Sequence, residues 1–124
     1  MNILLVDDEE MTLVALSKKL REQGYTVSVA TNTIEALKAV KEEKIDLIIS
    51  DIIMPMISGF TLLSMLKNFY YLSLPVILIS SYNQENVLLK SHSLGASDFV
   101  SKPINYDELF YKIEKYGNRN NAIK

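Results

Sequence analysis

Five short apolar segments alternate with five amphipathic segments along this chain of 124 residues. The apolar segments are rich in β-branched residues, which is typical of strands. They are Ile3–Val6, Tyr25–Ala30, Leu47–Ile49, Val76–Ile79 and Asp98–Val100. Four of them are continuously or almost continuously apolar, as in strands that are buried on both faces of a parallel sheet. Tyr25–Ala30 alternates polar and apolar residues, so we expect this strand at a sheet edge.

Apolar residues at helical spacing predict one helix after each strand. The predicted helices are Met11–Glu22, Ile34–Glu43, Phe60–Phe69, Glu85–Leu94 and Tyr106–Tyr116. Asn32 precedes Glu35 by three residues and can form a capping box with it, in which each side chain bonds the backbone N–H of the other residue. Asn105 precedes Glu108 in the same way at the start of the last helix. Gly24 and Gly117 suit the turns that end helices, so we expect the last helix to end at Gly117. Residues 118–124 are polar, and we expect a frayed tail.

Strands that alternate with helices form a parallel sheet through right-handed crossovers, with helices on both faces. We therefore predict a doubly wound α/β fold, with a five-stranded parallel sheet flanked by five helices. The length fits one domain, and a chain of this size buries enough surface to fold without disulfides. Ligands of such sheets bind beyond the carboxyl ends of the strands. The residues at those ends therefore decide the function.

Composition excludes several classes of protein. With no Cys and one His, the chain has no disulfide framework, thiolate zinc site or multi-histidine metal site. The net charge of −2 argues against nucleic acid as a direct partner, since phosphate binding needs clustered basic residues. The apolar runs are much shorter than the ~20 residues of a membrane-spanning helix. The N-terminus lacks the basic start of a signal peptide. We therefore expect a cytoplasmic protein with no membrane segment.

Polar residues gather at the predicted carboxyl edge of the sheet. Asp7 and Asp8 follow the first strand, Asp51 the third, Ser80 the fourth and Lys102 the fifth. Crowded carboxylates repel one another unless a cation is present, and an oxygen-only set suits Mg²⁺ better than Zn²⁺. An aspartate can accept a phosphoryl group, and the transfer needs positive charge such as Mg²⁺ and a lysine supply. These residue types therefore indicate Mg²⁺-dependent phosphoryl chemistry.

The motifs of this edge resemble those of the receiver domains of two-component response regulators, over residues 2–117. The motifs are Asp7-Asp8, Asp51-Ile52-Ile53-Met54-Pro55 with Gly59 following, Pro75 to Ser81, and Gly95 to Pro103. The resemblance implies a flavodoxin-like fold with strand order 2-1-3-4-5. It also implies a receiver domain over residues 1–117, with residues 118–124 as a polar C-terminal tail.

The resemblance implies an acceptor and a metal site. Asp51 matches the phosphoacceptor and one of the Mg²⁺ ligands. Asp8 matches a direct Mg²⁺ ligand, and Asp7 matches a ligand that assists through water. The main-chain carbonyl of Ile53 would be the third protein ligand.

The resemblance also implies a set of switch residues. Ser80 matches the switch hydroxyl and Lys102 the phosphate-binding lysine. Phe99 matches the aromatic position that rotates inward on activation, and an ordinary core role for Phe99 is the alternative. The peptide bond before Pro103 is expected to be cis, a geometry found almost only before proline.

By this resemblance the chain is a phosphorylation-activated signalling switch. It would take a phosphoryl group from a histidine kinase or a histidine phosphotransfer protein. The face formed by the fourth helix, the fifth strand and the fifth helix would then control binding of an unknown downstream protein or effector domain. Tyr106, Tyr111, Lys112 and Tyr116 are candidates for that face, since aromatic residues suit interfaces, although several of them must also pack the core. We expect a monomer or a phosphorylation-dependent dimer that assists its own modification but turns over no separate substrate.

Three alternatives stay open. A phosphatase of the haloacid dehalogenase kind needs a second aspartate two residues after its nucleophile, where this chain has Ile53. A binding module that never needs phosphorylation is the second, although all residues of the acceptor site are present. The third is that the chain is the receiver part of a longer regulator.

Overall fold

The computed structural model describes residues 1–52, 59–70, 74–81, 93 and 95–122. Within these residues, five strands form one parallel sheet in the order β2-β1-β3-β4-β5. The strands are β1 (Asn2–Val6), β2 (Thr26–Ala30), β3 (Leu47–Asp51), β4 (Val76–Ser80) and β5 (Asp98–Ser101). The predicted doubly wound fold and its strand order are confirmed. β2 lies at a sheet edge, as its alternating pattern predicts.

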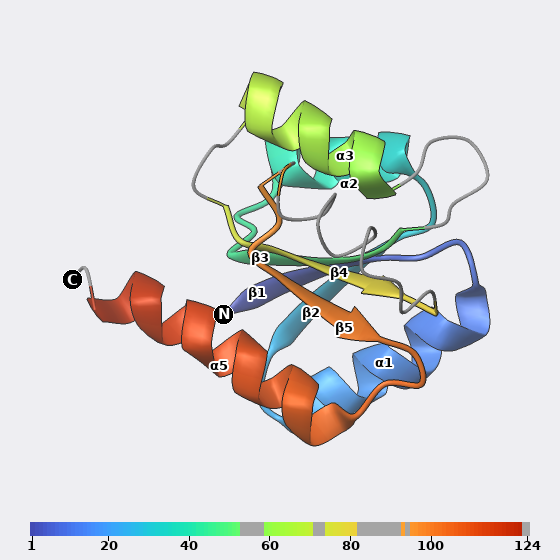
Figure 1. Cartoon of the computed structure of the whole chain (residues 1–124), viewed down its shortest axis with the longest axis vertical. Helices are drawn as coiled ribbons and strands as arrows, with labels where there is room; N and C mark the ends of the chain where they lie inside the picture. The colour runs from blue at the N-terminus through green and yellow to red at the C-terminus, as the bar shows by residue number, and fades with distance from the viewer. Residues whose placement is uncertain (53–58, 71–73, 82–92, 94, 123–124) are drawn as a thin grey trace.

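Helices cover both faces of the sheet, with α1 and α5 on one face and α2 and α3 on the other (Figure 1). The helices are α1 (Glu10–Glu22), α2 (Thr33–Glu42), α3 (Gly59–Met65) and α5 (Tyr106–Ala122), and α3 continues in a π-helical turn, η1 (Leu66–Tyr70). The helix predicted over Glu85–Leu94 lies outside the described residues except for Ser93. In the part of the chain that the structure describes, no helix is long and apolar enough to cross a membrane.

Each face of the sheet carries its own apolar layer. Leu5 of β1 packs with Leu16 of α1 and Ile113 of α5, whereas its neighbour Leu4 packs with Leu63 of α3 in the other layer. Successive side chains of a strand point to opposite faces, so a strand that is buried on both faces has to be apolar at every position. Burying one such side chain contributes about 1.5–3 kcal/mol. The two layers therefore fix the positions of the strand ends.

Side-chain caps start two helices where the sequence predicts them. Asn32 Oδ1 accepts the Glu35 N–H at 2.9 Å, and Asn105 Oδ1 accepts the Glu108 N–H at 3.1 Å. The Glu35 carboxylate accepts both the N–H and the hydroxyl of Thr31, each at 2.7 Å, in place of the Asn32 N–H, so half of the expected capping box forms. These bonds satisfy N–H groups that have no partner inside the helix.

The last helix extends past its predicted end. α5 continues to Ala122, so the prediction of a helix end at Gly117 is wrong. A glycine that ends a helix adopts a positive φ, and among the described glycines only Gly24 and Gly95 do so. Gly117 is buried within the helix, and a Cβ there would collide with the Cε of Met1. Its missing side chain makes room for the N-terminal residue and does not end the helix.

Candidate functional site

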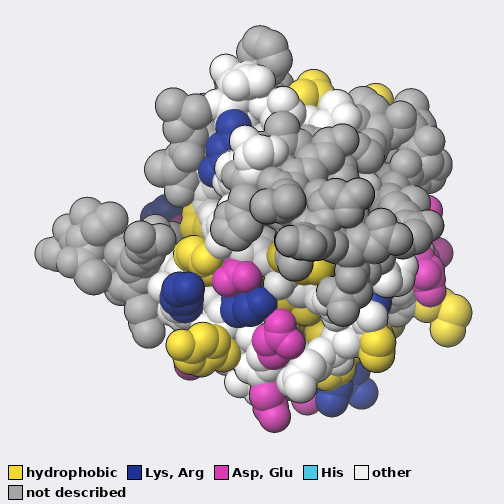
Figure 2. Space-filling model, viewed as in Figure 1, with side chains coloured by type: hydrophobic (Ala, Val, Ile, Leu, Met, Phe, Trp, Pro, Cys, Tyr) yellow, Lys and Arg dark blue, Asp and Glu magenta, His cyan; other side chains and the backbone are white. Residues whose placement is uncertain are grey.

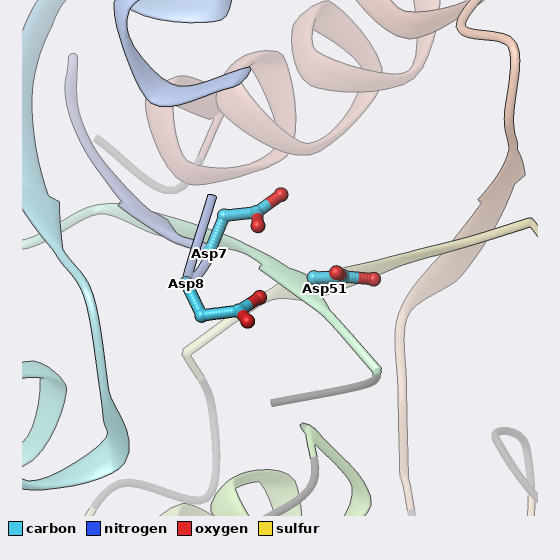
Figure 3. A group of neighbouring side chains, drawn as sticks. All are labelled: Asp7, Asp8 and Asp51. Atoms are coloured by element: carbon cyan, nitrogen blue, oxygen red, sulfur yellow. The ribbon is translucent and has the colours of Figure 1, made fainter. Parts of the chain in front are cut away.

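Three carboxylates meet at the carboxyl edge of the sheet. Asp7 and Asp8 follow β1 directly, and Asp51 is the last residue of the neighbouring β3. Because Val6 lies opposite Ser50 in the parallel register, the residue after each of them arrives at the same level. One oxygen from each carboxylate lies within 4.8 Å of the others, and Figure 3 shows the three side chains extending to the same side.

Two of these carboxylates are buried, and the surroundings of Asp7 raise its pKa. Asp7 is 7% and Asp51 9% exposed, whereas Asp8 is exposed. Burial raises the pKa of Asp7 above its ordinary value, and the charge of Asp51 raises it further. The Glu9 N–H, which donates to Asp7 Oδ1 at 2.9 Å, and the Lys102 ammonium lower the pKa but do not cancel the rise. Burial is the main reason that the pKa of Asp7 rises, and the negative charges of Asp51 and Asp8 add to it.

The cluster suits a hard divalent cation. Its donors are carboxylate oxygens, which Mg²⁺ prefers. Oxygen ligands at 2.0–2.1 Å from an octahedral Mg²⁺ lie about 3–4 Å from one another, and the carboxylate oxygens here are already within 4.8 Å. The exposed Asp8 leaves the cluster open to the water ligands that Mg²⁺ usually keeps. Ile53, whose carbonyl the resemblance adds to the ligand set, lies outside the described residues.

Lys102 brings a positive charge to the cluster. Its ammonium lies 3.4 Å from Asp51 Oδ2 and 3.8 Å from Asp7 Oδ2. Lys102 follows β5 directly, and its N–H donates to the Ser80 carbonyl at 2.8 Å, which fixes this end of β5 to β4. The Lys102–Pro103 peptide bond is cis, the geometry that the resemblance implies. One ammonium beside three carboxylates leaves an excess of negative charge, which fits the raised pKa of Asp7.

Ser80 and Phe99 lie on the two strands beyond Asp51. Ser80 ends β4 and is 1% exposed, directly after Ile79, which is opposite Asp51 in the register. Phe99 lies on the edge strand β5, is partly buried and packs against the apolar layer beneath α2 and α3. This placement suits both a core residue and an aromatic switch, so the switching role of Phe99 stays a prediction.

Sequence reasoning missed a polar network that joins β5 to α5. The Lys112 ammonium lies 3.1 Å from Asp98 Oδ1 and 3.0 Å from Glu108 Oε1, and it donates to the Phe99 carbonyl at 2.8 Å. The Tyr116 hydroxyl donates to Asp98 Oδ2 at 3.3 Å. The spacing of Glu108 and Lys112, four residues apart on one helix, is a sequence signal for their pair. No sequence signal places Asp98 beside them, because that contact depends on tertiary packing.

The residues predicted for an exposed binding face divide into exposed and buried ones. Tyr111 is 70% exposed, as a binding face requires. Tyr116 is 6% exposed, so it is one of the candidates that pack the core. Its ring packs in the layer beneath α1 and α5, and its hydroxyl donates to the Ser97 carbonyl. Tyr106 is partly buried against the same layer.

The fold and the site together define a class of protein, a doubly wound domain that presents three carboxylates and a lysine at the carboxyl edge of its sheet. Residues 3–114 match the response regulator receiver domain, and the chain belongs to this family. Receiver domains are signalling switches of two-component systems that interact with kinases and with downstream effectors.

Relatives and solved structures agree with this family. The chain is 36% identical over 112 residues to the response regulator GtcR of Aneurinibacillus migulanus, covering 90% of this chain and 46% of that protein. A two-component response regulator from Clostridium difficile has a TM-score of 0.91 at 27% identity, over 98% of both chains. The response regulator TrrA from Thermotoga maritima, solved in complex with Mg²⁺-BeF, has a TM-score of 0.84 at 36% identity, over 93% of this chain and 97% of that chain. The chain spans about half the length of the curated relatives it matches.

Proposed function

We propose that this chain is a phosphorylation-activated switch in which Asp51 accepts a phosphoryl group from a histidine kinase or a histidine phosphotransfer protein, with Mg²⁺ held at the acidic cluster. The observation that carries the proposal is the position of the Asp51 carboxylate. It ends β3 beside the carboxylates of Asp7 and Asp8, with the Lys102 ammonium 3.4 Å from its Oδ2. The TrrA structure in complex with Mg²⁺-BeF supports Mg²⁺ as the cofactor.

Each residue of the site would have a separate role in phosphoryl transfer. An Asp51 oxygen attacks phosphorus, and the bond from phosphorus to the imidazole nitrogen of the donor breaks. Mg²⁺, when bound, neutralises charge on the transferring group, and Asp7 and Asp8 would hold it. The Lys102 ammonium already lies where negative charge accumulates, so it needs little rearrangement. Ser80 ends the adjacent strand, and its hydroxyl would donate to a phosphoryl oxygen.

The output would be a change in the face formed by the fourth helix, predicted over Glu85–Leu94, together with β5 and α5. That face would control binding of a downstream protein or effector domain. We further propose a receiver unit over residues 1–117 that acts in the cytoplasm, as a monomer or a phosphorylation-dependent dimer, with no direct nucleic-acid or membrane partner. Residues 118–124 would be a polar extension, of which residues up to Ala122 continue α5.

The proposal includes no turnover of a separate substrate. A phosphatase of the haloacid dehalogenase kind uses a second aspartate as acid and base two residues after its nucleophile. Position 53 is isoleucine, which cannot transfer a proton. Steady release of phosphate from small phosphoesters would contradict this part of the proposal.

Intact-mass measurement of the purified chain with acetyl phosphate and Mg²⁺ tests the acceptor. We expect a gain of one phosphoryl group, which is lost in Asp51→Asn and in wild type with EDTA. Asp107→Asn is the matched control, because it makes the same chemical change at an exposed residue of α5. It should gain the phosphoryl group as wild type does.

Two results would overturn the proposal. Equal labelling of Asp51→Asn and wild type would place the acceptor elsewhere. No labelling by acetyl phosphate, combined with equal partner binding by wild type and Asp51→Asn, would favour a binding module that does not need phosphorylation.

A further inference from the structure

Side chains from two elements hold the main chain of β5 at Phe99. The Phe99 N–H donates to Asp98 Oδ1 at 2.8 Å, and the Phe99 carbonyl accepts from Lys112 Nζ at 2.8 Å. The Asp98 carboxylate and the Lys112 ammonium also pair with each other at 3.1 Å. Because β5 is an edge strand, these two side chains take the place that a further strand would have. We call Asp98 and Lys112 the Phe99 clamp.

The clamp is supported and shielded from water. The Glu108 carboxylate lies 3.0 Å from the Lys112 ammonium, and the Tyr116 hydroxyl donates to Asp98 Oδ2 at 3.3 Å. The side chains of Lys112 and Asp98 are only 20% and 22% exposed, so their interaction is screened less than that of a surface pair. Figure 2 shows acidic and basic side chains touching one another over α5.

Lys112 stays protonated at this position. Burial alone would lower the pKa of the Lys112 ammonium, but the carboxylates of Glu108 and Asp98 outweigh burial and raise it. The ammonium therefore stays charged and keeps its bond to the Phe99 carbonyl throughout the physiological pH range.

The strand that the clamp holds also carries a residue of the acceptor site. Lys102 lies three positions beyond Phe99, roughly 10 Å along a strand, and its ammonium is 3.4 Å from Asp51 Oδ2. Among the strands of the described residues, β5 is bonded to β4 alone. α5 is therefore tied to one part of this short strand, and Asp51 contacts the residue that follows the strand.

We propose that Lys112 is a positioning residue of the switch, which through the Phe99 clamp ties α5 to the strand leading to Lys102, so that a change at Asp51 moves α5 together with β5. The inference rests on the proposed function and deepens it. Without the ammonium, α5 still packs on the sheet through Leu109 and Ile113. The main chain at Phe99, however, is no longer bonded to α5, so the response of α5 weakens while the acceptor site stays intact.

Hydrogen–deuterium exchange of the full chain, with and without beryllofluoride and Mg²⁺, measures the response of α5 to a stable phosphoryl mimic. Lys112→Met removes the ammonium and keeps an apolar stem, and Lys112→Arg restores the charge. Lys115→Met is the matched control, since it removes the same charge from the same helix. The Lys115 ammonium lies over the Tyr116 ring, 5.5 Å from its centroid, and within the described residues it makes no hydrogen bond or ion pair with β5. The melting temperature of the same samples, measured at increasing concentrations of beryllofluoride, reports how tightly each variant binds it at the acceptor site.

We expect beryllofluoride to change exchange across Tyr106–Tyr116 in wild type, Lys112→Arg and Lys115→Met. In Lys112→Met the change should be smaller by at least about threefold, which corresponds to the low end of the net contribution of one hydrogen bond. Binding of beryllofluoride should stay within about twofold of wild type. Asp98→Asn, which keeps an acceptor for the Phe99 N–H but loses the ion pair, should weaken the α5 response as well, and it keeps the test decisive if Lys112→Met does not fold.

Every other outcome contradicts either the inference about Lys112 or the proposed function. If Lys112→Met binds beryllofluoride and its α5 responds as in wild type, the clamp has no positioning role, while the proposed function stands. If Lys112→Met no longer binds beryllofluoride, Lys112 supports the acceptor site as a whole and the inference is wrong. If wild type does not bind beryllofluoride at all, the proposed function fails and the inference fails with it.

Discussion

Asp7 is a carboxylate buried beside two others, and its raised pKa has a measurable consequence. An acid whose pKa is higher in the folded than in the unfolded chain holds its proton more tightly when folded, so stability falls as pH rises through that window. We expect Asp7→Asn in EDTA at pH 7 to raise the free energy of unfolding by on the order of 1 kcal/mol. Below about pH 4 the gain in stability should vanish, because Asp7 of the wild type is then protonated and as uncharged as the asparagine that replaces it.

Urea unfolding at both pH values, followed by circular dichroism, measures this difference. An asparagine oxygen can still accept the Glu9 N–H, and Lys102 keeps Asp51 as a partner, so the substitution mainly removes the buried charge. Asp107→Asn, at an exposed position in the first turn of α5, should have the opposite sign and lower stability at pH 7 by about 0.3–1 kcal/mol, because it removes a charge that favours a helix N-terminus. A loss of stability for Asp7→Asn at pH 7 would show that the bonds of this carboxylate outweigh the cost of its burial.

Ser17 is a second residue with a polar group in an unfavourable, buried environment. Its hydroxyl is the one buried side-chain polar atom among the described residues that has no hydrogen-bond partner. Burying such a group costs about 1–3 kcal/mol, and alanine also favours the helix. We expect Ser17→Ala to raise the free energy of unfolding by about 1 kcal/mol. Ser28→Ala is the control with the opposite sign, because the Ser28 hydroxyl donates to Glu43 Oε1 at 2.7 Å. Equal destabilisation of both variants would mean that Ser17 has a partner in solution.

At the scale of elements, two glycines at helix positions serve different purposes. Gly24 follows α1 with a φ of 94° and has no heavy atom within 4 Å of where a Cβ would lie. Gly24→Ala should therefore lower the free energy of unfolding by about 1–2 kcal/mol through backbone strain alone. Gly117 lies inside α5, and a Cβ there would meet only the flexible end of Met1. Gly117→Ala should raise stability by up to about 1 kcal/mol, since alanine is the better helix former. Thermal unfolding compares the two, and an equal loss in both would show that Met1 cannot move aside.

The same glycines show which features of the elements can be predicted from sequence. The end of α1 and the caps at Asn32 and Asn105 were predicted correctly, because each depends on residues a few positions apart. The end of α5 was not predicted correctly, because Gly117 packs against Met1 at the other end of the chain. The partner of Lys112 was missed for the same reason. Local chemistry can be predicted from sequence, whereas contacts between distant elements need the folded chain.

At the scale of the whole molecule, the candidate site follows from topology. A parallel sheet brings the carboxyl ends of its strands to one edge, so Asp7, Asp51 and Lys102 could be placed together before any coordinates existed. Their separations, the burial of Asp7 and its bond to the Glu9 N–H depend on how β1, β3 and β5 pack and could not be predicted. Ile53 and the helix predicted over Glu85–Leu94 lie outside the described residues, so these two predictions stay as they were.

The acidic cluster should also link metal binding to the stability of the whole chain. A ligand that binds only the folded state stabilises it by RT ln(1 + [L]/Kd), about 1.4 kcal/mol at ten times Kd. We therefore expect the melting temperature to rise with Mg²⁺ at pH 7 and to fall back when EDTA is added. Near pH 4 protons compete for the carboxylates, and the effect should largely disappear. Asp8→Asn and Asp51→Asn should each reduce the shift, whereas Asp107→Asn should keep it. An equal Mg²⁺ shift in Asp51→Asn and wild type would place the metal away from the acceptor, whose carboxylate would then keep the Lys102 ammonium as a cationic partner.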